Sequence, residues 1–295
     1  MPRVLLLGAG GQLGMVLAKR LAGMVDLVTL DRSQLDIANE NSLRSAVRDF
    51  SPEITINAAA YTAVDKAESE PELCRQVNAV APGVIAAEIA KTNGWLIHYS
   101  TDYVFDGSGT KAWMETDATG PLSVYGQTKL DGELAIAAAG CRHAILRTSW
   151  VYAAVGRNFL HTMLRLGRER EQLKIVDDQI GAPTSAEAIT EATLAVVSQL
   201  EAARDAKSGV YHLTCSGETS WCGFARAIFA QFAARQKAPE VLPIPTEAYP
   251  TPAKRPKNSR LNCDKFVAQF GFQMPSWESA LGDVAAVMLE PGAKV

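Results

Sequence analysis

The residues that most directly suggest chemistry are Tyr125 and Lys129, in the stretch Tyr125-Gly126-Gln127-Thr128-Lys129. Residues four apart lie on one face of a helix, so a phenol and an ammonium group would stand side by side. This pair suits the reduction of a ketone, because the carbonyl oxygen must receive a proton and a neighbouring cation lowers the pKa of the phenol that gives it. The same spacing also occurs on solvated helix faces, which is the alternative interpretation.

A pair of hydroxyl residues, Ser100 and Thr101, follows the apolar segment 95–99. If this segment is a strand of a parallel sheet, the pair lies at the carboxyl edge, where such sheets bind their ligands. A hydroxyl there can hold a substrate carbonyl oxygen beside the phenol. The two hydroxyls therefore favour a catalytic interpretation of the tyrosine and lysine pair.

A glycine-rich segment, Gly8-Ala9-Gly10-Gly11-Gln12-Leu13-Gly14, stands between the apolar run 4–7 and a helical pattern. Glycines permit the tight turn and the close approach of a pyrophosphate, which binds the free N–H groups at the start of the helix. Asp31 follows the second apolar run, where a carboxylate can accept the hydroxyls of an adenosine ribose. We predict a dinucleotide site; the alternatives are an unliganded turn and an aspartate that only caps a turn.

Strand and helix patterns alternate through the first half of the chain and would position both groups. The predicted strands are 4–7, 27–30, 54–56, 95–99 and 144–146, and the predicted helices are 13–21, 43–50, 70–91 and 122–139. This alternation predicts right-handed crossovers and a doubly wound parallel sheet, that is, a Rossmann-type α/β fold. We predict a dinucleotide-binding domain over residues 1–147.

The pattern is looser in the second half, where we expect residues 148–295 to form mainly a smaller, less regular substrate domain. The apolar residues 174–176 and an alanine-rich helix from about 185 to 203 allow residues from about 172 to 205 to return to the Rossmann sheet. The segment 239–256 is rich in proline, so we expect it to be irregular.

Composition excludes several classes of protein. The chain has 295 residues, 47% of them hydrophobic, and a formal net charge of −3, which argues against disorder and against non-specific binding to nucleic acid. The run 4–7 is too short for a signal peptide, and no later run approaches the roughly 20 residues that span a bilayer. The five cysteines contain no C-x-x-C pair, which suits a reduced cytoplasm and gives no zinc signature. We expect a cytoplasmic protein without nucleic-acid or membrane partners, and a homodimer stays open.

Taken together, the motifs resemble a known family. The glycine loop, residues 57–60 (NAAA), Ser100-Thr101 and the Tyr125/Lys129 pair are similar to those of the extended short-chain dehydrogenase/reductases. More narrowly, six separated segments up to about residue 280 resemble the dTDP-4-dehydrorhamnose reductase family: NAAAYTAVDKAESEPEL (57–73), HYSTDYVF (98–105), ETDATGPLSVYGQTK (115–129), RTSWVY (147–152), DQIGAPT (178–184) and RPKNSRL (255–261). Six matches in order are far more specific than either short motif.

The resemblance implies NAD(P)H-dependent reduction of the 4-keto group of dTDP-4-dehydro-β-L-rhamnose to dTDP-β-L-rhamnose, the last step of dTDP-rhamnose biosynthesis. It implies that Thr101 orients the carbonyl, Tyr125 donates the proton, and Lys129 lowers the pKa of the phenol and holds the nicotinamide ribose. The residues implied at the cofactor, including those of the glycine loop, are Gly8, Gly11, Gln12, Leu13, Gly14, Asp31, Asp36, Ile37, Ala60, Tyr61, Thr62 and Tyr99.

The resemblance also implies a set of substrate contacts. Thr101, Asp102 and Trp150 would meet the sugar, with a core aromatic as the alternative for Trp150. Arg255 and Arg260 are candidates for the diphosphate, since forked guanidinium groups suit it, and either could instead be a surface ion-pair residue. Some members of the family are linked with Mg²⁺ through carboxylates that include one on the first helix. Residues 15–17 (MVL) stand at that place, so the sequence does not support Mg²⁺ and we assign no metal ligand.

Cofactor choice depends on two neighbouring residues. Asp31 should bind the ribose diol of NADH and repel the 2′-phosphate of NADPH, whereas Arg32 can give that phosphate a charge-assisted hydrogen bond. We therefore expect both NADH and NADPH to be used.

Two rival functions remain. One is a nucleotide-sugar 4,6-dehydratase of the same fold. The family resemblance implies that such an enzyme carries Thr-Asp-Glu after the fourth strand, with the glutamate as base, whereas this chain has Thr101-Asp102-Tyr103. The other is a non-catalytic regulatory subunit that keeps the nucleotide pocket, which fold alone does not exclude. The presence of Thr101, Tyr125 and Lys129 favours the reductase over both.

Overall fold

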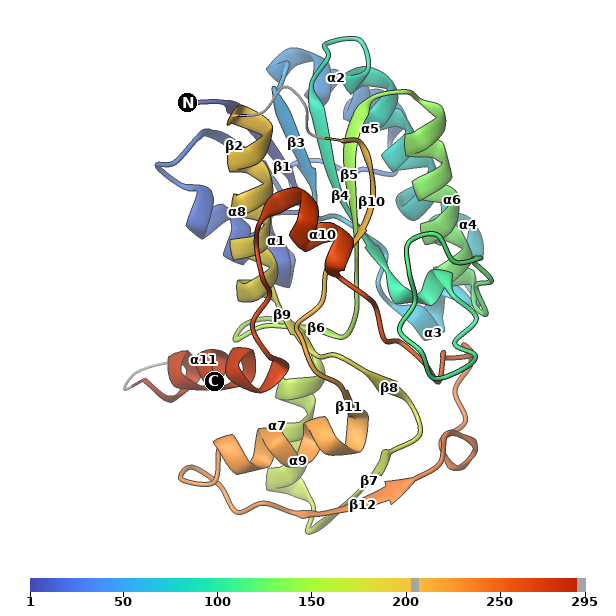
Figure 1. Cartoon of the computed structure of the whole chain (residues 1–295), viewed down its shortest axis with the longest axis vertical. Helices are drawn as coiled ribbons and strands as arrows, with labels where there is room; N and C mark the ends of the chain where they lie inside the picture. The colour runs from blue at the N-terminus through green and yellow to red at the C-terminus, as the bar shows by residue number, and fades with distance from the viewer. Residues whose placement is uncertain (203–206, 291–295) are drawn as a thin grey trace.

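Six parallel strands form the central sheet of the computed structural model, which describes residues 1–202 and 207–290 (Figure 1). Their order is β10-β5-β4-β3-β1-β2. The strands are β1 (Arg3–Leu7), β2 (Asp26–Leu30), β3 (Ile54–Asn57), β4 (Trp95–Thr101), β5 (Arg142–Thr148) and β10 (Gly209–His212). The order reverses between β1 and β3, and helices lie on both sides of the sheet, so the expected doubly wound α/β fold is confirmed.

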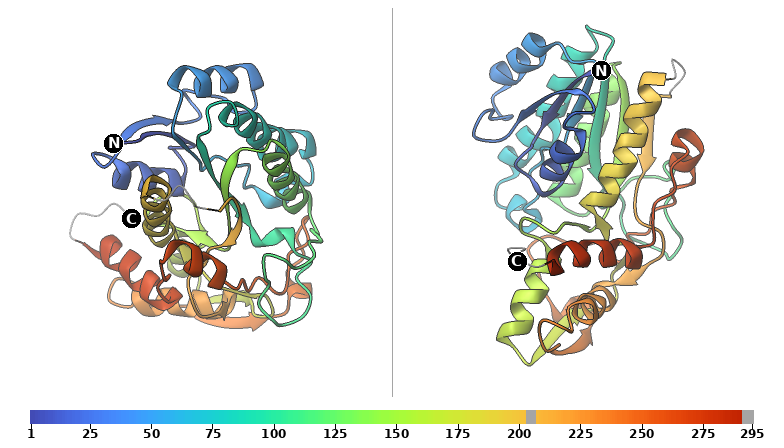
Figure 2. Two further views of the ribbon diagram at one scale, coloured as in Figure 1. Left: turned by 45° about the horizontal axis from the view of Figure 1, so that its top comes forward. Right: turned by 90° about the vertical axis from the view of Figure 1, so that its left-hand side faces the viewer.

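Helices cover both faces of this sheet (Figure 2). On one face α1 (Gln12–Leu21) packs beside α8 (Ala186–Ala202), and on the other α2 (Glu40–Phe50), α5 (Ala81–Ile89) and α6 (Val124–Ala138) lie in a row. Side chains of a strand alternate between faces, so Val4 and Leu6 join one apolar core while Leu5 and Leu7 join the other. The apolar run 4–7 is therefore buried on both sides, as a central parallel strand requires.

The helix predicted over residues 70–91 is divided into three pieces. They are α4 (Pro71–Arg75), the π-helical turn η1 (Gln76–Val80) and α5, preceded by the short α3 (Val64–Ala67). The wide turn lies against α6 at Gly132, where an added Cβ would come 2.1 Å from the carbonyl oxygen of Asn78. A glycine at this point lets the two helices approach this closely.

The smaller lobe is built from short strand pairs and helices. β7 (Gln172–Val176) pairs with β12 (Glu240–Ile244), β8 (Ile180–Gly181) with β11 (Thr219–Ser220), and β6 (Val151–Tyr152) with β9 (Thr184–Ser185).

The remaining helices of the described chain, in both lobes, are η2 (Asp102–Val104), α7 (Phe159–Glu169), α9 (Trp221–Gln231), η3 (Thr246–Ala248), α10 (Asp264–Phe270) and α11 (Trp277–Leu289).

Two expectations for the second half are wrong. Residues 174–176, the strand of the stretch from about 172 to 205, do not return to the Rossmann sheet: they lie in β7, which pairs with β12, while β10 takes the sixth place beside β5. The helix of the same stretch, α8, packs beside α1 on one face of that sheet. The segment 239–256 is not irregular throughout, because residues 240–244 form β12. Its Pro243 is tolerated because this sheet has only two strands, so one edge of β12 needs no N–H donor. The division between residues 147 and 148 stays a prediction.

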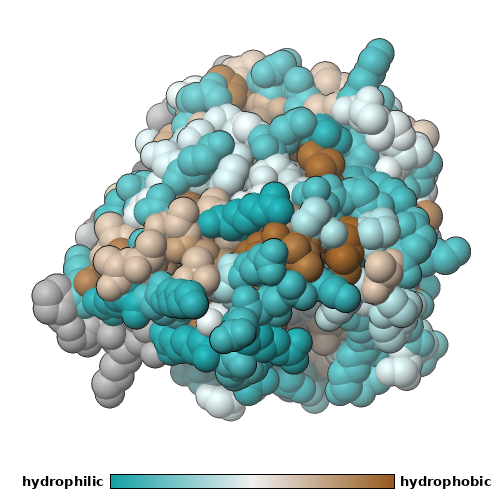
Figure 3. All heavy atoms as spheres, turned by 90° about the horizontal axis from the view of Figure 1, so that it is seen from below, coloured by the Kyte–Doolittle hydropathy of each residue, from teal (hydrophilic) through white to brown (hydrophobic). Residues whose placement is uncertain are grey.

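The surface of the small-lobe end is mostly hydrophilic, with hydrophobic residues gathered in limited areas (Figure 3). Over residues 1–202 and 207–290, no helix combines the length and the apolar character needed to cross a membrane.

Candidate active site

The glycine loop joins β1 to α1 at the carboxyl edge of the sheet. Gly8 has φ +82°, and an added Cβ there would come 2.5 Å from the backbone nitrogen of Ala59. A Cβ at Gly14 would come 2.1 Å from the Gly8 carbonyl oxygen. Both positions therefore require glycine, and no side chain caps the start of α1, so its backbone N–H groups face the loop unscreened.

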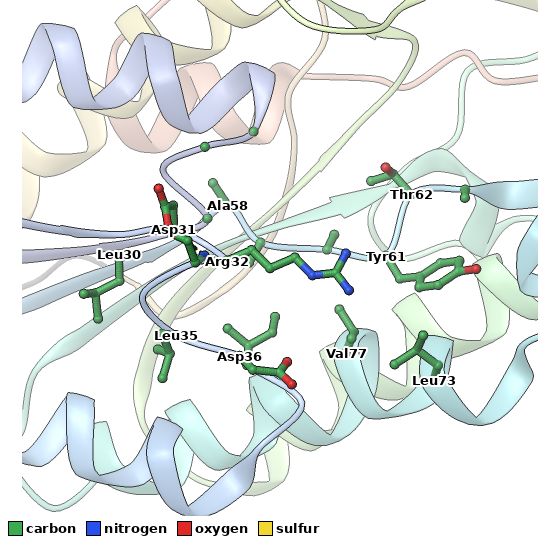
Figure 4. A pocket seen from close by; sticks show the side chains of 18 of the residues that line it. Leu30, Asp31, Arg32, Leu35, Asp36, Ala58, Tyr61, Thr62, Leu73 and Val77 are labelled. Atoms are coloured by element: carbon green, nitrogen blue, oxygen red, sulfur yellow. Dashed lines mark hydrogen bonds between the residues drawn. The ribbon is translucent and has the colours of Figure 1, made fainter.

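A cavity of about 720 Å³ opens beside this loop (Figure 4). It is lined by the predicted cofactor residues Gly8, Gly11, Asp31, Arg32, Asp36, Ile37, Ala60, Tyr61 and Thr62. Its size and its place at the switch point of the sheet suit a dinucleotide. Tyr99 lies apart from these residues: its hydroxyl bonds to Thr193 of α8 at 2.7 Å, deep under the sheet edge.

Asp31 and Arg32 differ in how firmly they are held. The Asp31 carboxylate accepts hydrogen bonds from the Ser33 hydroxyl at 2.6 Å and the Ser33 backbone N–H at 2.8 Å, and these bonds lower the pKa of Asp31. The Arg32 side chain extends across the cavity toward Tyr61 (Figure 4). A fixed carboxylate and an extended guanidinium thus face the same space.

Thr101 and Tyr125 meet at the end of β4. Ser123 caps α6 by accepting the Gly126 N–H at 3.2 Å, which places Tyr125 in the first turn. Gly126 allows the approach, because a Cβ there would come 2.3 Å from the Tyr103 carbonyl oxygen. Burial raises the pKa of Tyr125, and interaction with the Thr101 hydroxyl opposes the rise.

Lys129 lies one helical turn after Tyr125 and is buried. Its Nζ donates to the Tyr99 carbonyl oxygen at 2.6 Å and lies 3.2 Å from His98 Nε2. Burial lowers the pKa of Lys129 to about 8. His98 Nδ1 in turn lies 3.1 Å from Asn57 Nδ2, so a buried polar chain stands behind the lysine. The sequence predicts no role for His98, although a histidine inside the apolar strand WLIHY is a signal of a buried polar contact.

A buried ion pair also supports the site and was not predicted. Arg147 of β5 binds Glu133 of α6, with Nη2 2.6 Å from Oε2 and Nε 2.9 Å from Oε1. The Ser100 hydroxyl donates to Glu133 Oε1 at 2.5 Å. Ser100 was expected, with Thr101, to offer a hydroxyl to the substrate carbonyl oxygen. In the structure its hydroxyl contacts the Glu133 carboxylate of this ion pair instead.

Asn78, in the π-helical turn, fixes the loop that carries Tyr61. Its Oδ1 accepts the Tyr61 N–H at 2.8 Å, and its Nδ2 donates to the Tyr61 carbonyl at 3.0 Å. The same Nδ2 lies 3.4 Å from the Thr128 hydroxyl, next to Lys129. This buried side chain thus joins the cavity wall to the helix that carries the catalytic pair, a link that the sequence pattern gave no reason to expect.

The predicted substrate residues come from several separate parts of the chain. Asp102 is buried, which raises its pKa to about 6, although hydrogen bonds with Ser259 and Thr101 oppose the rise. Trp150 follows β5, whose Thr148 is the register partner of Thr101. Each proposed diphosphate residue has an ion-pair partner: Arg255 binds Asp65 at 2.8 Å, and Arg260 binds Glu218 through both Nε and Nη2.

In the described part of the chain, no group of three or more His, Cys, Asp or Glu side chains could hold a metal ion.

Comparison with known proteins identifies relatives along nearly the whole chain. A family model described as the RmlD substrate binding domain matches residues 2–289. The dTDP-4-dehydrorhamnose reductase of Burkholderia thailandensis is 47% identical over 288 residues, 95% of this chain and 97% of the relative. The enzyme of the same name from Escherichia coli K12 is 45% identical, over 93% of this chain and 94% of the relative.

Solved structures agree. A dTDP-4-dehydrorhamnose reductase from Clostridium acetobutylicum superposes with a TM-score of 0.89 at 36% identity, covering 97% of this chain and 99% of the other. One from Bacillus anthracis, in complex with NADP, also has a TM-score of 0.89 at 36% identity, with 96% and 98% covered. The glycine loop, the cavity beside it and the Thr101 and Tyr125 pair therefore belong to a chain whose relatives match 93–97% of its length. The chain belongs to the dTDP-4-dehydrorhamnose reductase family.

Proposed function

We propose that this protein reduces the 4-keto group of dTDP-4-dehydro-β-L-rhamnose to give dTDP-β-L-rhamnose, with NADPH or NADH as the reductant. The observation that carries the proposal is the placement of Thr101, at the end of β4, and of Tyr125, in the first turn of α6, at the sheet edge that also holds the glycine loop. The names of the relatives, and the NADP bound to the Bacillus anthracis structure, support the substrate and the cofactor.

The cavity residues fit a dinucleotide. Gly10 and Gly11 line the cavity at the start of α1 and leave room there for a pyrophosphate, while Asp31 and Arg32 face the place of the adenosine ribose. A bound reduced nicotinamide supplies the hydride for the carbonyl carbon.

The side chains of the protein supply the proton and the orientation. Thr101 holds the carbonyl oxygen, and the Tyr125 phenol gives its proton to that oxygen as negative charge develops there. An ammonium group on Lys129 stabilises the phenolate that remains. Asp102 and Trp150 are proposed to contact the sugar, and Arg255 and Arg260 the diphosphate.

The proposal is tested by incubating the purified protein with NADPH and dTDP-4-dehydro-β-L-rhamnose and identifying the sugar product. We expect dTDP-β-L-rhamnose, with one NADPH oxidised for each sugar reduced. The same protein given dTDP-glucose and NAD⁺ should release no 4-keto-6-deoxy product, because Tyr103 stands where a dehydratase has its glutamate. A dehydration rate comparable to that of reduction would favour the dehydratase, and no turnover of either substrate would favour the regulatory subunit.

We expect the reaction to slow in alkaline solution. Because the pKa of Lys129 is lowered to about 8, the ammonium group is lost as pH rises through that value, whereas an ordinary lysine stays charged. kcat/KM should fall up to roughly tenfold per pH unit above about pH 8. A pH–rate profile measures this, with Lys129→Met as the variant that should lack the alkaline decline. A wild-type profile that stays flat to pH 10 would contradict the role of the ammonium group.

Cofactor selectivity should depend on Arg32. Replacing it with alanine removes a guanidinium that can bind the 2′-phosphate, so kcat/KM for NADPH should fall roughly 10- to 100-fold. The value for NADH should barely change, and it is the internal control because only the phosphate differs. For the wild-type protein, the kcat/KM values for NADPH and NADH should agree within about two powers of ten. The contributions of Asp31 and Arg32 to cofactor binding oppose each other, and each is of order 1.5–3 kcal/mol. Equal losses for the two cofactors would show that Arg32 does not read the phosphate.

We also propose that the enzyme is cytoplasmic. All five cysteines are free thiols, as a reducing compartment maintains.

A further inference from the structure

Trp150 has a backbone conformation that bulky residues rarely adopt. Its φ is +50°, in the left-handed region. Within residues 1–202 and 207–290 the other non-glycine residues with positive φ are Ser51, which ends α2, and Asn93, in the turn before β4. Strain of this kind persists where the surrounding structure enforces it, and it gathers at functional sites.

The neighbouring backbone holds Trp150 in place. Its carbonyl accepts the Thr184 N–H at 3.3 Å, and the preceding Ser149 hydroxyl donates to the Ala182 carbonyl at 3.0 Å. The indole lies close to Gly181, where an added Cβ would come 3.0 Å from Trp150 Cε2. The position of the ring is therefore defined from the side of β8 and β9.

Trp221 defines the plane of that ring from the small lobe. The two indoles are stacked, with ring centroids 3.7 Å apart and planes 12° apart. Trp221 is the first residue of α9, which Ser220 caps by accepting the Gly223 N–H at 2.9 Å. Phe159 of α7 packs on Trp221 at a centroid distance of 4.7 Å. Both indoles are partly exposed, so the stack forms an accessible aromatic surface.

We propose that Trp221 is a positioning residue, which fixes the Trp150 indole as the wall against which the 6-deoxysugar ring packs. This inference rests on the proposed function. Trp150 stands two residues beyond Thr148, the register partner of Thr101, so the wall lies on the same edge as the proton-donating pair. A sugar that carries a methyl group at C5 offers an apolar face, and an aromatic ring held in one plane binds it in one orientation. Without Trp221, the Trp150 ring would lose the indole that stacks on it from α9.

The test compares Trp221→Leu with Trp221→Phe in the full-length protein, using NADPH and dTDP-4-dehydro-β-L-rhamnose. The leucine variant should raise KM for the sugar nucleotide and lower kcat/KM by roughly 10- to 100-fold, because a misplaced wall displaces the carbonyl from Thr101 and Tyr125. The dissociation constant for NADPH should stay within about twofold, and phenylalanine should restore much of the loss since it keeps a stacking ring.

Circular dichroism gives a direct measure of the stack. Two indoles this close produce an exciton signal, which Trp221→Leu and Trp221→Phe should both abolish. Phe159→Leu is the matched control: it removes a ring that contacts Trp221 from α7, so it should keep the signal and most of the activity.

The outcomes separate the two proposals. If the wild-type protein reduces the substrate but the folded leucine variant, with its exciton signal lost, keeps kcat/KM within about twofold, the role of Trp221 is wrong. Equal losses in Trp221→Leu and Phe159→Leu would also overturn it, because they would indicate general loosening of the small lobe. If the leucine variant does not fold, Trp221→Met decides, because it fills part of the same space without a stacking ring: kcat/KM within about twofold of the wild-type value would refute the inference. A wild-type protein that does not reduce the substrate would instead contradict the proposed function.

Discussion

Replacing Tyr125 with phenylalanine should lower kcat by roughly 10²–10⁴-fold while NADPH affinity barely changes. The substitution keeps the aromatic ring, which packs edge-to-face on Tyr103 at a centroid distance of 5.5 Å, and removes the hydroxyl that meets Thr101. The protein therefore loses its proton donor without a cavity in the core. Steady-state kinetics with the sugar nucleotide, together with fluorescence titration of NADPH, measure the two effects separately.

Tyr103→Phe is the matched control for this experiment. Tyr103 is a neighbouring phenol to which no catalytic role is assigned, and burial raises its pKa too. Its loss should change kcat by less than about tenfold. If Tyr125→Phe keeps more than about a tenth of the wild-type turnover, or if Tyr103→Phe loses as much, Tyr125 is not the proton donor.

The parts of the site that depend on local geometry could be predicted from the sequence. The glycine loop is one, because Gly8 and Gly14 stand where any side chain would collide with the backbone. The placement of Thr101 is another, since the end of a buried strand in a parallel sheet marks the ligand edge. These features need only a strand, a turn and a helix in sequence.

The parts that depend on long-range pairing could not be predicted. β7 is as apolar as a strand of the main sheet, and only the competing partner β12 shows where it belongs. The short β10 carries no pattern that places it beside β5. The stack of Trp150 on Trp221 likewise joins residues that lie far apart in the sequence, so each tryptophan alone reads as a core aromatic.

Buried polar groups such as Glu133 and Arg147 were also outside the reach of sequence patterns. Each is about 4% exposed, and charged residues are almost never buried unless they are paired. A glutamate in a helix and an arginine in a strand carry no sign that they will meet. Removing one partner of this pair is therefore expected to lower the stability of the protein strongly.

Replacing Glu133 with glutamine should lower the free energy of unfolding by about 3–5 kcal/mol, because it leaves the Arg147 guanidinium buried without its carboxylate. The penalty is high because Nη1 of Arg147 already lacks a hydrogen-bond partner. Urea denaturation of the wild-type and variant proteins measures the difference, provided that both unfold in one transition.

The double variant Glu133→Gln/Arg147→Met is the control, since it removes both charges and keeps apolar bulk in place of the guanidinium. It should be more stable than Glu133→Gln alone, as expected when the cost comes from an orphaned charge rather than from a lost contact. Glu133 also raises the pKa of Lys129, so its removal should move the alkaline decline of kcat/KM to lower pH. If Glu133→Gln costs less than about 1 kcal/mol and leaves the pH profile unchanged, the guanidinium finds water or another partner, and the buried pair does not hold α6 and its lysine against the sheet.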